Sequence, residues 1–111
     1  MPISPGDIYW LHHDALDDQP RIAHPQVVVE VDGETVTVCA LTTNMRKVSM
    51  PGNVLLDIGE GGLSKRSIVE VSKVAAVPVA RLGEYVGALS EERVAQIRAG
   101  IRFVETAFRD R

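Results

Sequence analysis

Residues 26–42 read QVVVEVDGETVTVCALT, so two runs of β-branched residues flank the dipeptide Asp32-Gly33. β-Branched side chains favour extended backbone. Asp-Gly suits a two-residue type I′ hairpin turn, because both turn positions need a positive φ. The sequence therefore predicts an antiparallel hairpin of strands 26–31 and 35–42. In such a hairpin the start of the first strand lies beside the end of the second.

Shorter apolar segments on either side of the hairpin predict further strands. Residues 7–11 and 53–57 are short apolar runs that follow Pro-Gly turns, and residues 67–79 alternate between apolar and polar side chains. Pro78 favours an edge or a bend at the end of the long strand. Residues 80–84 predict a helical turn.

The last predicted element is a helix over residues 90–108. Ser90 is a suitable N-cap, and the acidic residues that follow it are favourable in a first helical turn. Apolar residues recur at steps of three or four and form one stripe: Val94, Ile97, Ile101, Val104 and Phe108. Gly100 lies inside the helix, where glycine costs about 1 kcal/mol relative to alanine. We therefore expect close packing against another segment at Gly100.

These elements predict one α+β domain over residues 1–111, a length that fits a single domain. Five or more short antiparallel strands in so small a chain must curl into a small barrel to cover their own core, with the helix at the C-terminus. The apolar content of 45% and charged content of 24% are those of a globular protein. No apolar run approaches the ~18 residues of a membrane span, so we expect a cytoplasmic protein.

The residue types that bind metals do not form a recognisable motif. Cys39 is the only cysteine and lies in an apolar run, so a packed core thiol is favoured over a nucleophile. His12 and His13 are adjacent, and no cysteine or third histidine lies near them in the sequence. We therefore expect no bound metal and no cofactor. The net charge of −3 argues against a sequence-independent nucleic-acid coat, which is normally strongly basic.

One polar cluster is predicted at an end of the hairpin. His24 precedes the first strand, and Thr42 ends the second, so the antiparallel pairing brings them side by side. Thr43 and Asn44 follow Thr42 directly, and Arg21 lies three residues before His24. Without further information these residues have an ordinary structural explanation, in which His24 caps a strand end and Thr42 satisfies local backbone groups.

The cluster also suits cleavage of RNA by its own 2′-hydroxyl. That reaction needs a base, an acid, and donors for the charge that develops on phosphorus. His24 is the candidate base or acid, Arg21 the candidate phosphate clamp, and Thr42 the candidate donor to a phosphoryl oxygen. Further candidates for RNA binding are the polar and basic residues Thr43, Asn44, Arg46, Lys47, Lys65 and Arg66. From charge alone, a solvated surface explains the basic residues equally well.

The sequence resembles the MazF/PemK family of type II toxin–antitoxin endoribonucleases. The matching segments occur in family order and cover nearly the whole chain: 5–10 (PGDIYW), 24–29 (HPQVVV), 37–44 (TVCALTTN), 51–56 (PGNVLL), 61–69 (GGLSKRSIV) and 81–90 (RLGEYVGALS). The resemblance implies an SH3-like curled antiparallel barrel with a C-terminal helix, as in MazF, PemK and CcdB. It also implies a homodimer, metal-independent cleavage of single-stranded mRNA at a short sequence, and neutralisation by a cognate antitoxin.

Three positions depart from the family pattern. The resemblance assigns the family's threonine to Thr42, but His24 stands where the family usually carries its catalytic arginine. Glu70 stands where some members carry a functional arginine, and residues 32–34 replace a longer loop. Two other functions compete with the endoribonuclease. One is a barrel that has lost cleavage and only binds RNA or an antitoxin-like peptide. The other is an inhibitor of a protein target that acts through its C-terminal helix.

Overall fold

A computed structural model of the chain describes residues 2–12 and 24–109. Its strands and its one α-helix are β1 (Asp7–Leu11), β2 (Gln26–Asp32), β3 (Thr35–Thr42), β4 (Val54–Leu56), β5 (Ser67–Pro78), β6 (Leu82–Ala88) and α1 (Glu91–Arg109). Its short 3-10 helices are η1 (Met45–Ser49), η2 (Glu60–Gly62) and η3 (Val79–Arg81). In the part of the chain that these ranges cover, no helix is long and apolar enough to cross a membrane.

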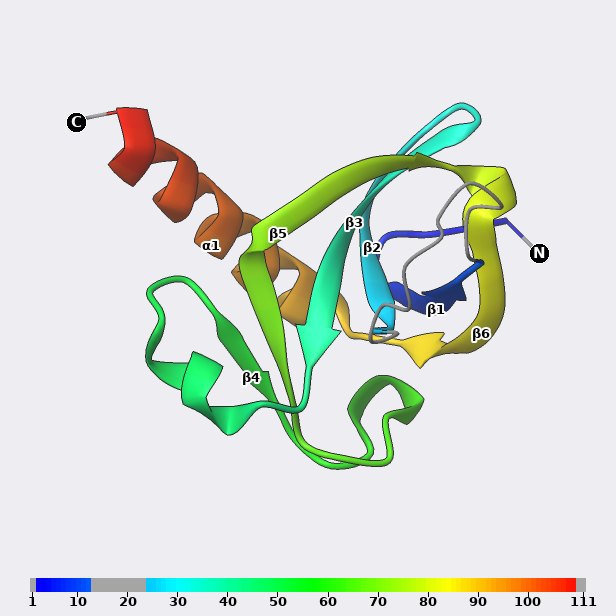
Figure 1. The fold of residues 1–111 in the computed structure, drawn as a ribbon. Coiled ribbons are helices and arrows are strands. Elements are labelled where there is room, and N and C mark those ends of the chain that lie inside the picture. The colour runs from blue at the N-terminus through cyan, green and yellow to red at the C-terminus, as the bar shows by residue number, and fades with distance from the viewer. Residues whose placement is uncertain (1, 13–23, 110–111) are drawn as a thin grey trace, which may run out of the picture.

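The strands form one antiparallel sheet in the order β4-β5-β3-β2-β1-β6. The sheet is strongly curled, and α1 lies against one of its faces (Figure 1). The predicted α+β class, with a curled antiparallel sheet and a C-terminal helix, is confirmed. The sheet does not close into a complete barrel, because β4 and β6 remain its two edges.

The predicted hairpin forms, but its turn differs from the predicted type. Asp32 pairs with Thr35, so the two turn residues are Gly33 and Glu34 rather than Asp32 and Gly33. Gly33 has a φ of 60°, whereas no described residue other than glycine has a positive φ. A type I′ turn needs positive φ at both positions, while a type II′ turn needs glycine only at the first. The type I′ prediction is therefore wrong, and the glycine position fits a type II′ turn.

Two apolar clusters hold the sheet together, as expected when successive strand side chains point to opposite faces. The larger cluster lies between the sheet and α1, and it includes Ile8, Leu41, Leu63 and Ile97. The smaller cluster gathers valines of β2, β3 and β5. Cys39 is fully buried in the larger cluster, and its Sγ donates a hydrogen bond to the Glu70 carbonyl at 3.0 Å. Burial raises the pKa of the Cys39 thiol to about 12, so the expectation of a packed core cysteine is confirmed.

The N-terminal end of α1 agrees with the prediction. The Ser90 hydroxyl accepts a hydrogen bond from the Arg93 backbone N–H at 3.2 Å, as an N-cap should. Arg98, further along the helix, donates from Nε and Nη2 to the Val29 carbonyl at 3.2 and 2.7 Å. A β-bulge interrupts the β2–β3 ladder between Val28 and Glu30. The arginine therefore satisfies a carbonyl at an irregular point of the ladder.

Gly100 explains how α1 approaches the sheet. A Cβ atom built on Gly100 would overlap the carbonyl oxygen of Gly52, and one built on Gly52 would lie 2.9 Å from the Gly100 carbonyl oxygen. The predicted close packing at Gly100 is confirmed. The contact fixes the segment between η1 and β4 against the helix.

The prediction missed strand β6. The helical turn expected at residues 80–84 is the shorter η3, and β6 starts directly after it. Among the described strands, β6 pairs only with β1, for example with Tyr85 opposite Tyr9. An edge strand that is half exposed has no strong apolar alternation, which is why the sequence pattern did not reveal it.

Candidate active site

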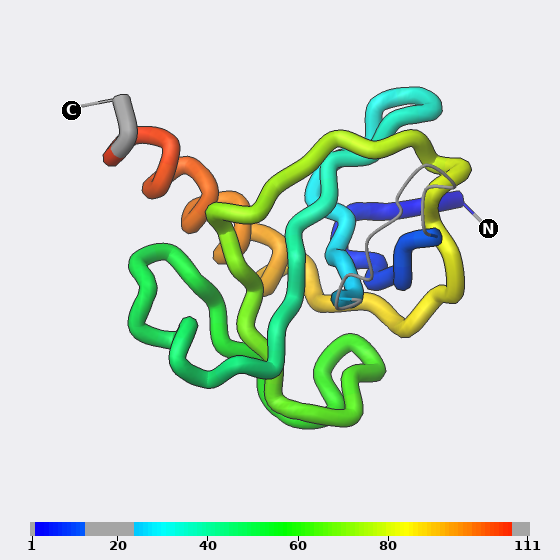
Figure 2. The backbone as a smooth tube through the Cα atoms, viewed as in Figure 1, coloured from blue at the N-terminus to red at the C-terminus, as the bar shows by residue number. Residues whose placement is uncertain are grey.

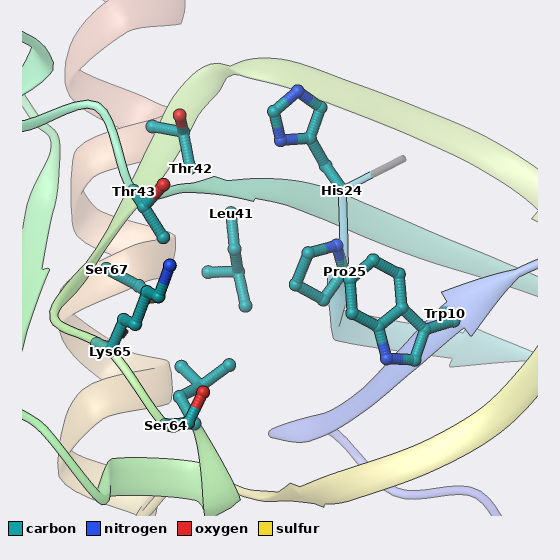
Figure 3. A pocket seen from close by; sticks show the side chains of 10 residues that line it. Trp10, His24, Pro25, Leu41, Thr42, Thr43, Ser64, Lys65 and Ser67 are labelled. Atoms are coloured by element: carbon teal, nitrogen blue, oxygen red, sulfur yellow. Dashed lines mark hydrogen bonds between the residues drawn. The ribbon is translucent and has the colours of Figure 1, made fainter. Parts of the chain in front are cut away.

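A pocket of about 300 Å³ opens at the end of the sheet where β2 begins and β3 ends. Figure 3 shows the side chains that line it. Leu41 and Leu63 belong to the main core and form the inner part of the pocket. The other lining residues are Trp10, His24, Pro25, Thr42, Thr43, Ser64, Lys65 and Ser67.

The β2–β3 register brings His24 and Thr42 to this pocket. Gln26 pairs with Ala40, and one step further the Leu41 N–H donates to the Pro25 carbonyl at 3.0 Å. A second step along the same register places His24 opposite Thr42, just beyond the start of β2. The sequence predicted this juxtaposition, and both side chains line the pocket. His24 is half-buried.

The Thr42 hydroxyl can accept one hydrogen bond within the fold and donate another. Its Oγ1 accepts a hydrogen bond from the Asn44 backbone N–H at 3.2 Å, which is the structural role that the sequence allowed. A hydroxyl carries one donor hydrogen in addition to its acceptor lone pairs. Within the described ranges the Thr42 hydroxyl donates no hydrogen bond, so its hydrogen is available to a ligand in the pocket.

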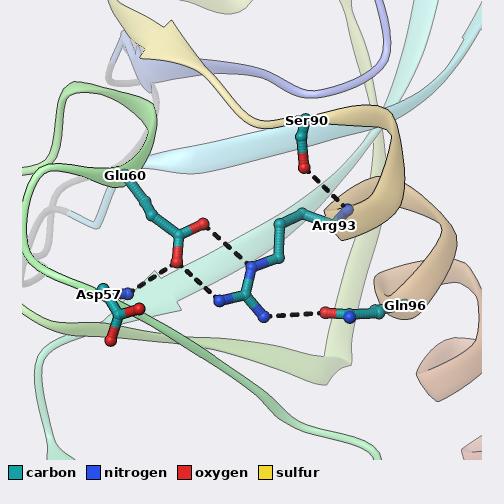
Figure 4. Close-up of polar contacts among 5 residues, drawn as sticks. All are labelled: Asp57, Glu60, Ser90, Arg93 and Gln96. Atoms are coloured by element: carbon teal, nitrogen blue, oxygen red, sulfur yellow. Dashed lines mark hydrogen bonds and ion pairs between the residues drawn. The ribbon is translucent and has the colours of Figure 1, made fainter.

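The wall formed by residues 63–67 carries the one cation that lines the pocket in the described part of the chain. Lys65 is exposed and lines the pocket together with Ser64. The buried Ser67 donates from Oγ to the Lys65 carbonyl at 3.1 Å, which fixes the turn that carries Lys65. This wall follows η2, which packs beside β6 (Figure 2). Arg93 of α1 also holds this segment through Glu60 (Figure 4).

Most of the other predicted RNA-binding residues lie outside this pocket. Thr43 lines it, but Asn44 instead accepts the Arg46 N–H on Oδ1 at 3.1 Å and so caps η1. η1 carries Arg46 and Lys47 away from the pocket lining, and the Lys47 carbonyl accepts from Asn53 Nδ2 at 2.9 Å. Of the four predicted basic contacts, Lys65 is the one that lines the pocket; Arg66 is exposed beside it.

Two further positions bear on the predicted site. Arg21 lies outside the residues that the structure describes. Glu70 is buried on β5, with its Oε2 3.5 Å from Lys73 Nζ, and it does not line the pocket. The carboxylate at this position therefore serves a local ion pair. Within the described ranges, no group of three or more His, Cys, Asp or Glu side chains could hold a metal ion.

The sequence did not identify Ser64 as a site residue, nor Trp10 and Pro25, which form an apolar wall of the pocket. Trp10 and Pro25 lie where the β1–β2 ladder ends, since Ile8 pairs with Val27 and Tyr9 with Gln26. The available signal was a lone tryptophan at the end of a strand. Ser64 becomes part of the site because the loop after β4 packs beside β6 through η2.

The chain matches a known protein family over most of its length. The family model described as "PemK-like, MazF-like toxin of type II toxin-antitoxin system" matches residues 4–104. Endoribonuclease MazF2 of Mycobacterium bovis is 28% identical, with 94% of this chain and 97% of that protein covered. Endoribonuclease MazF6 of Mycobacterium tuberculosis shows the same identity and coverage.

Solved structures share the fold. An endoribonuclease in complex with its cognate antitoxin, from a mycobacterial species, superposes with a TM-score of 0.69 at 19% identity and covers 91% of each chain. The Mycobacterium tuberculosis toxin MazF-mt6 gives a TM-score of 0.66 at 23% identity, with 86% of this chain and 91% of that chain covered. The match to the family model includes every strand and most of α1. This chain therefore belongs to the PemK-like, MazF-like toxin family of type II toxin–antitoxin systems.

Proposed function

We propose that this protein is an endoribonuclease toxin that cuts single-stranded mRNA at a short sequence without a metal ion. The observation that carries the proposal is the family match over residues 4–104. The pocket supports it, because an imidazole, a hydroxyl and an ammonium group line one concave site. The curated relatives are named endoribonucleases. mRNA as the substrate would place the activity in the cytoplasm.

The proposed reaction is an internal transfer on the RNA strand. The 2′-oxygen attacks the adjacent phosphorus while its proton passes to a base. The bond from phosphorus to the 5′-oxygen breaks, and that oxygen receives a proton. The products are a 2′,3′-cyclic phosphate and a 5′-hydroxyl, and no water or metal is consumed. His24 is our candidate for proton transfer, because imidazole can serve as base or acid near neutral pH.

Charge on the phosphoryl oxygens needs fixed donors. Lys65 is our candidate for the positive charge, because it lines the pocket. The free hydrogen of Thr42 is the candidate hydroxyl donor. Arg21 is proposed from the sequence alone as a second cation. His24 replaces the family's arginine, so we infer that proton transfer and charge stabilisation are divided between different residues in this chain.

We also propose a homodimer that a cognate antitoxin neutralises. An apolar groove of about 450 Å³ lies between α1 and the segment before β4, lined by Met50, Pro51, Asn53, Ser72, Phe103, Val104 and Ala107. Phe103 is 57% exposed there, and large exposed apolar side chains commonly mark interfaces. A two-fold dimer is the commonest closed assembly. The antitoxin proposal follows from family membership and from the antitoxin complex of the mycobacterial endoribonuclease.

The test is cleavage of a long single-stranded RNA in the presence of EDTA. We expect discrete fragments with 2′,3′-cyclic phosphate and 5′-hydroxyl ends. An RNA with one 2′-deoxynucleotide at the mapped site should resist cleavage there and remain sensitive elsewhere. If the folded protein cuts no RNA under any condition, with or without added divalent metal, the endoribonuclease proposal fails. If it cuts only with metal, the metal-independent mechanism fails.

A further inference from the structure

Trp10 occupies an unusual place for the largest apolar side chain of the protein. It lies near the end of β1 and lines the pocket, yet it is 39% exposed. The β1–β2 register pairs Ile8 with Val27 and Tyr9 with Gln26, and one further step places Trp10 opposite Pro25. Figure 3 shows the indole and the Pro25 ring on the same side of the pocket. The indole thus continues the apolar core to the edge of the pocket, where part of its surface remains exposed.

The neighbouring aromatic residues do not explain this exposure. Tyr9 and Tyr85 form an edge-to-face pair with centroids 5.4 Å apart, and it is the only such pair among the described residues. Tyr9 precedes Trp10 on the same strand, so the two side chains point to opposite faces. Tyr85 is exposed but has an aromatic partner, whereas Trp10 presents its surface to the pocket. An exposed indole in a pocket is suited to bind a flat apolar ligand.

The two sides of the pocket differ in chemistry. Trp10 and Pro25 form one apolar wall, and the core leucines form the inner part. The opposite side carries Thr42 and Lys65, with a hydroxyl and an ammonium group. A ligand that satisfies both sides has a flat, apolar ring joined to an anion. A nucleotide has this composition, because its base can stack and its phosphate can bind a cation.

We propose that Trp10, together with Pro25, forms a stacking subsite for one nucleobase beside the phosphate held at Thr42 and Lys65. The proposal deepens the proposed ribonuclease function and rests on it for the identity of the polymer. A volume of about 300 Å³ is at the small end of ligand pockets, so one base rather than several is accommodated. Stacking on an indole face accepts every base. Trp10 therefore contributes affinity and positions the strand, while other contacts select the sequence.

The single tryptophan of the chain allows a direct test. The probes are 2′-O-methyl RNA hexamers, which cannot undergo the 2′-hydroxyl attack, and a hexamer of equal charge without bases. Base-bearing hexamers should quench Trp10 fluorescence to saturation, and the abasic hexamer should not. Trp10→Leu should weaken binding of base-bearing hexamers by about tenfold to a hundredfold, the range expected for one stacked base. Its affinity for the abasic hexamer should stay the same.

Two further variants keep the test sharp. Trp10→Phe retains an aromatic face and should recover part of the lost affinity. Tyr85→Leu removes an exposed aromatic side chain outside the pocket lining and should bind every hexamer as the wild type does. The stacking subsite is overturned if Trp10→Leu binds base-bearing and abasic hexamers with the same ratio as the wild type. It is also overturned if the abasic hexamer quenches as strongly as the others.

The binding test of the stacking subsite does not depend on whether the protein cleaves RNA. Quenching by base-bearing hexamers in a protein that never cuts RNA would support the subsite while the endoribonuclease proposal fails. Conversely, a Trp10→Leu variant that cuts RNA with unchanged kcat and KM would overturn the subsite and leave the endoribonuclease proposal intact. If a base stacks on Trp10, the KM of Trp10→Leu should rise by about the same factor as its affinity for base-bearing hexamers falls.

Discussion

Arg93 of α1 donates two hydrogen bonds to the Glu60 carboxylate, from Nε to Oε2 at 3.0 Å and from Nη2 to Oε1 at 2.7 Å. Figure 4 shows this ion pair and its neighbours. The Glu60 Oε1 also accepts the Asp57 N–H at 2.9 Å, and Arg93 Nη1 donates to Gln96 at 2.9 Å. The pair thus links the first turns of the helix to the segment before Ser64. It holds one wall of the pocket in place from outside the pocket.

The ion pair makes stability depend on acid pH. The Arg93 hydrogen bonds hold the pKa of Glu60 below its ordinary value. A folded-state pKa below the unfolded one gives stability that is complete above the unfolded pKa, ~4.3, and is lost as pH falls through the folded value. We expect Glu60→Gln to cost about 1 kcal/mol of unfolding free energy at pH 7, in the range of a well-oriented pair. Urea unfolding from pH 3 to 7 measures this.

The difference between Glu60→Gln and the wild type should shrink below about pH 4.5. Glu84→Gln, which removes an exposed carboxylate on β6, is the control and should change stability little at any of these pH values. A constant difference for Glu60→Gln down to pH 3 would show that the carboxylate contributes by packing rather than by its charge.

Gly100→Ala should destabilise the protein although alanine is the better helix former. The substitution gains about 1 kcal/mol of helix propensity. The new methyl group would meet the backbone oxygen of Gly52, which cannot move as a flexible side chain can. Overpacking of this kind typically costs about 1–3 kcal/mol, so we expect a net loss in chemical denaturation. Ala99→Gly, at an exposed neighbouring position, should lose about 1 kcal/mol by propensity alone. A stabilised Gly100→Ala would show that α1 does not approach Gly52 closely.

Phe103→Glu should convert the proposed dimer to a monomer. A carboxylate in the apolar groove beside Met50 and Val104 would have to be buried without a partner in the interface. Sedimentation velocity at micromolar concentration distinguishes the two states. Ile58→Glu is a matched control, because Ile58 is 68% exposed and does not line the groove. A wild-type monomer at these concentrations would refute the dimer, and a dimeric Phe103→Glu would place the interface elsewhere.

Lys65 and the η1 cations should contribute differently to RNA binding. Lys65→Ala removes the one cation that lines the pocket among the described residues, so we expect it to lower both the cleavage rate and the affinity. Arg46→Ala combined with Lys47→Ala should weaken binding across sequences with little effect on the cleavage step, and should flatten the dependence of affinity on salt. Fluorescence anisotropy over a salt series measures both. An unchanged salt slope in the double variant would show that Arg46 and Lys47 do not contact phosphates.

The parts of the site that the sequence predicted are those that depend on local pairing. His24 and Thr42 come together because one short hairpin fixes their register, and a Gly-containing turn was visible in the sequence. The Ser64–Lys65 wall depends instead on a loop that packs beside β6, where Gly62 and Gly87 approach too closely for a side chain. That contact joins residues far apart in the sequence across an edge strand with weak alternation. No single local pattern encodes it, so Ser64 was not recognised as part of the pocket.

His24 carries the most specific chemical prediction. If it transfers the proton, His24→Ala should lower the cleavage rate by about 10²–10⁴, the usual contribution of one general acid or base. His24→Arg restores the residue that the family usually carries and should retain activity. Imidazole side chains change charge between about pH 5 and 8, whereas a guanidinium stays charged. If His24 transfers the proton, the wild-type rate should therefore depend on pH more strongly than the His24→Arg rate.

Single-turnover cleavage of a fixed RNA in EDTA, followed from pH 5 to 9, measures these rates without interference from product release. His12→Ala removes an exposed histidine that does not line the pocket, and its pH profile should match that of the wild type. Equal rates for His24→Ala and the wild type would remove His24 from the mechanism and leave Lys65 and Arg21 as the groups to test next. A His24→Ala variant that is slow but keeps the wild-type pH profile would assign His24 to positioning rather than proton transfer. A group that transfers the proton contributes to the pH dependence of the rate, so its removal should change that profile.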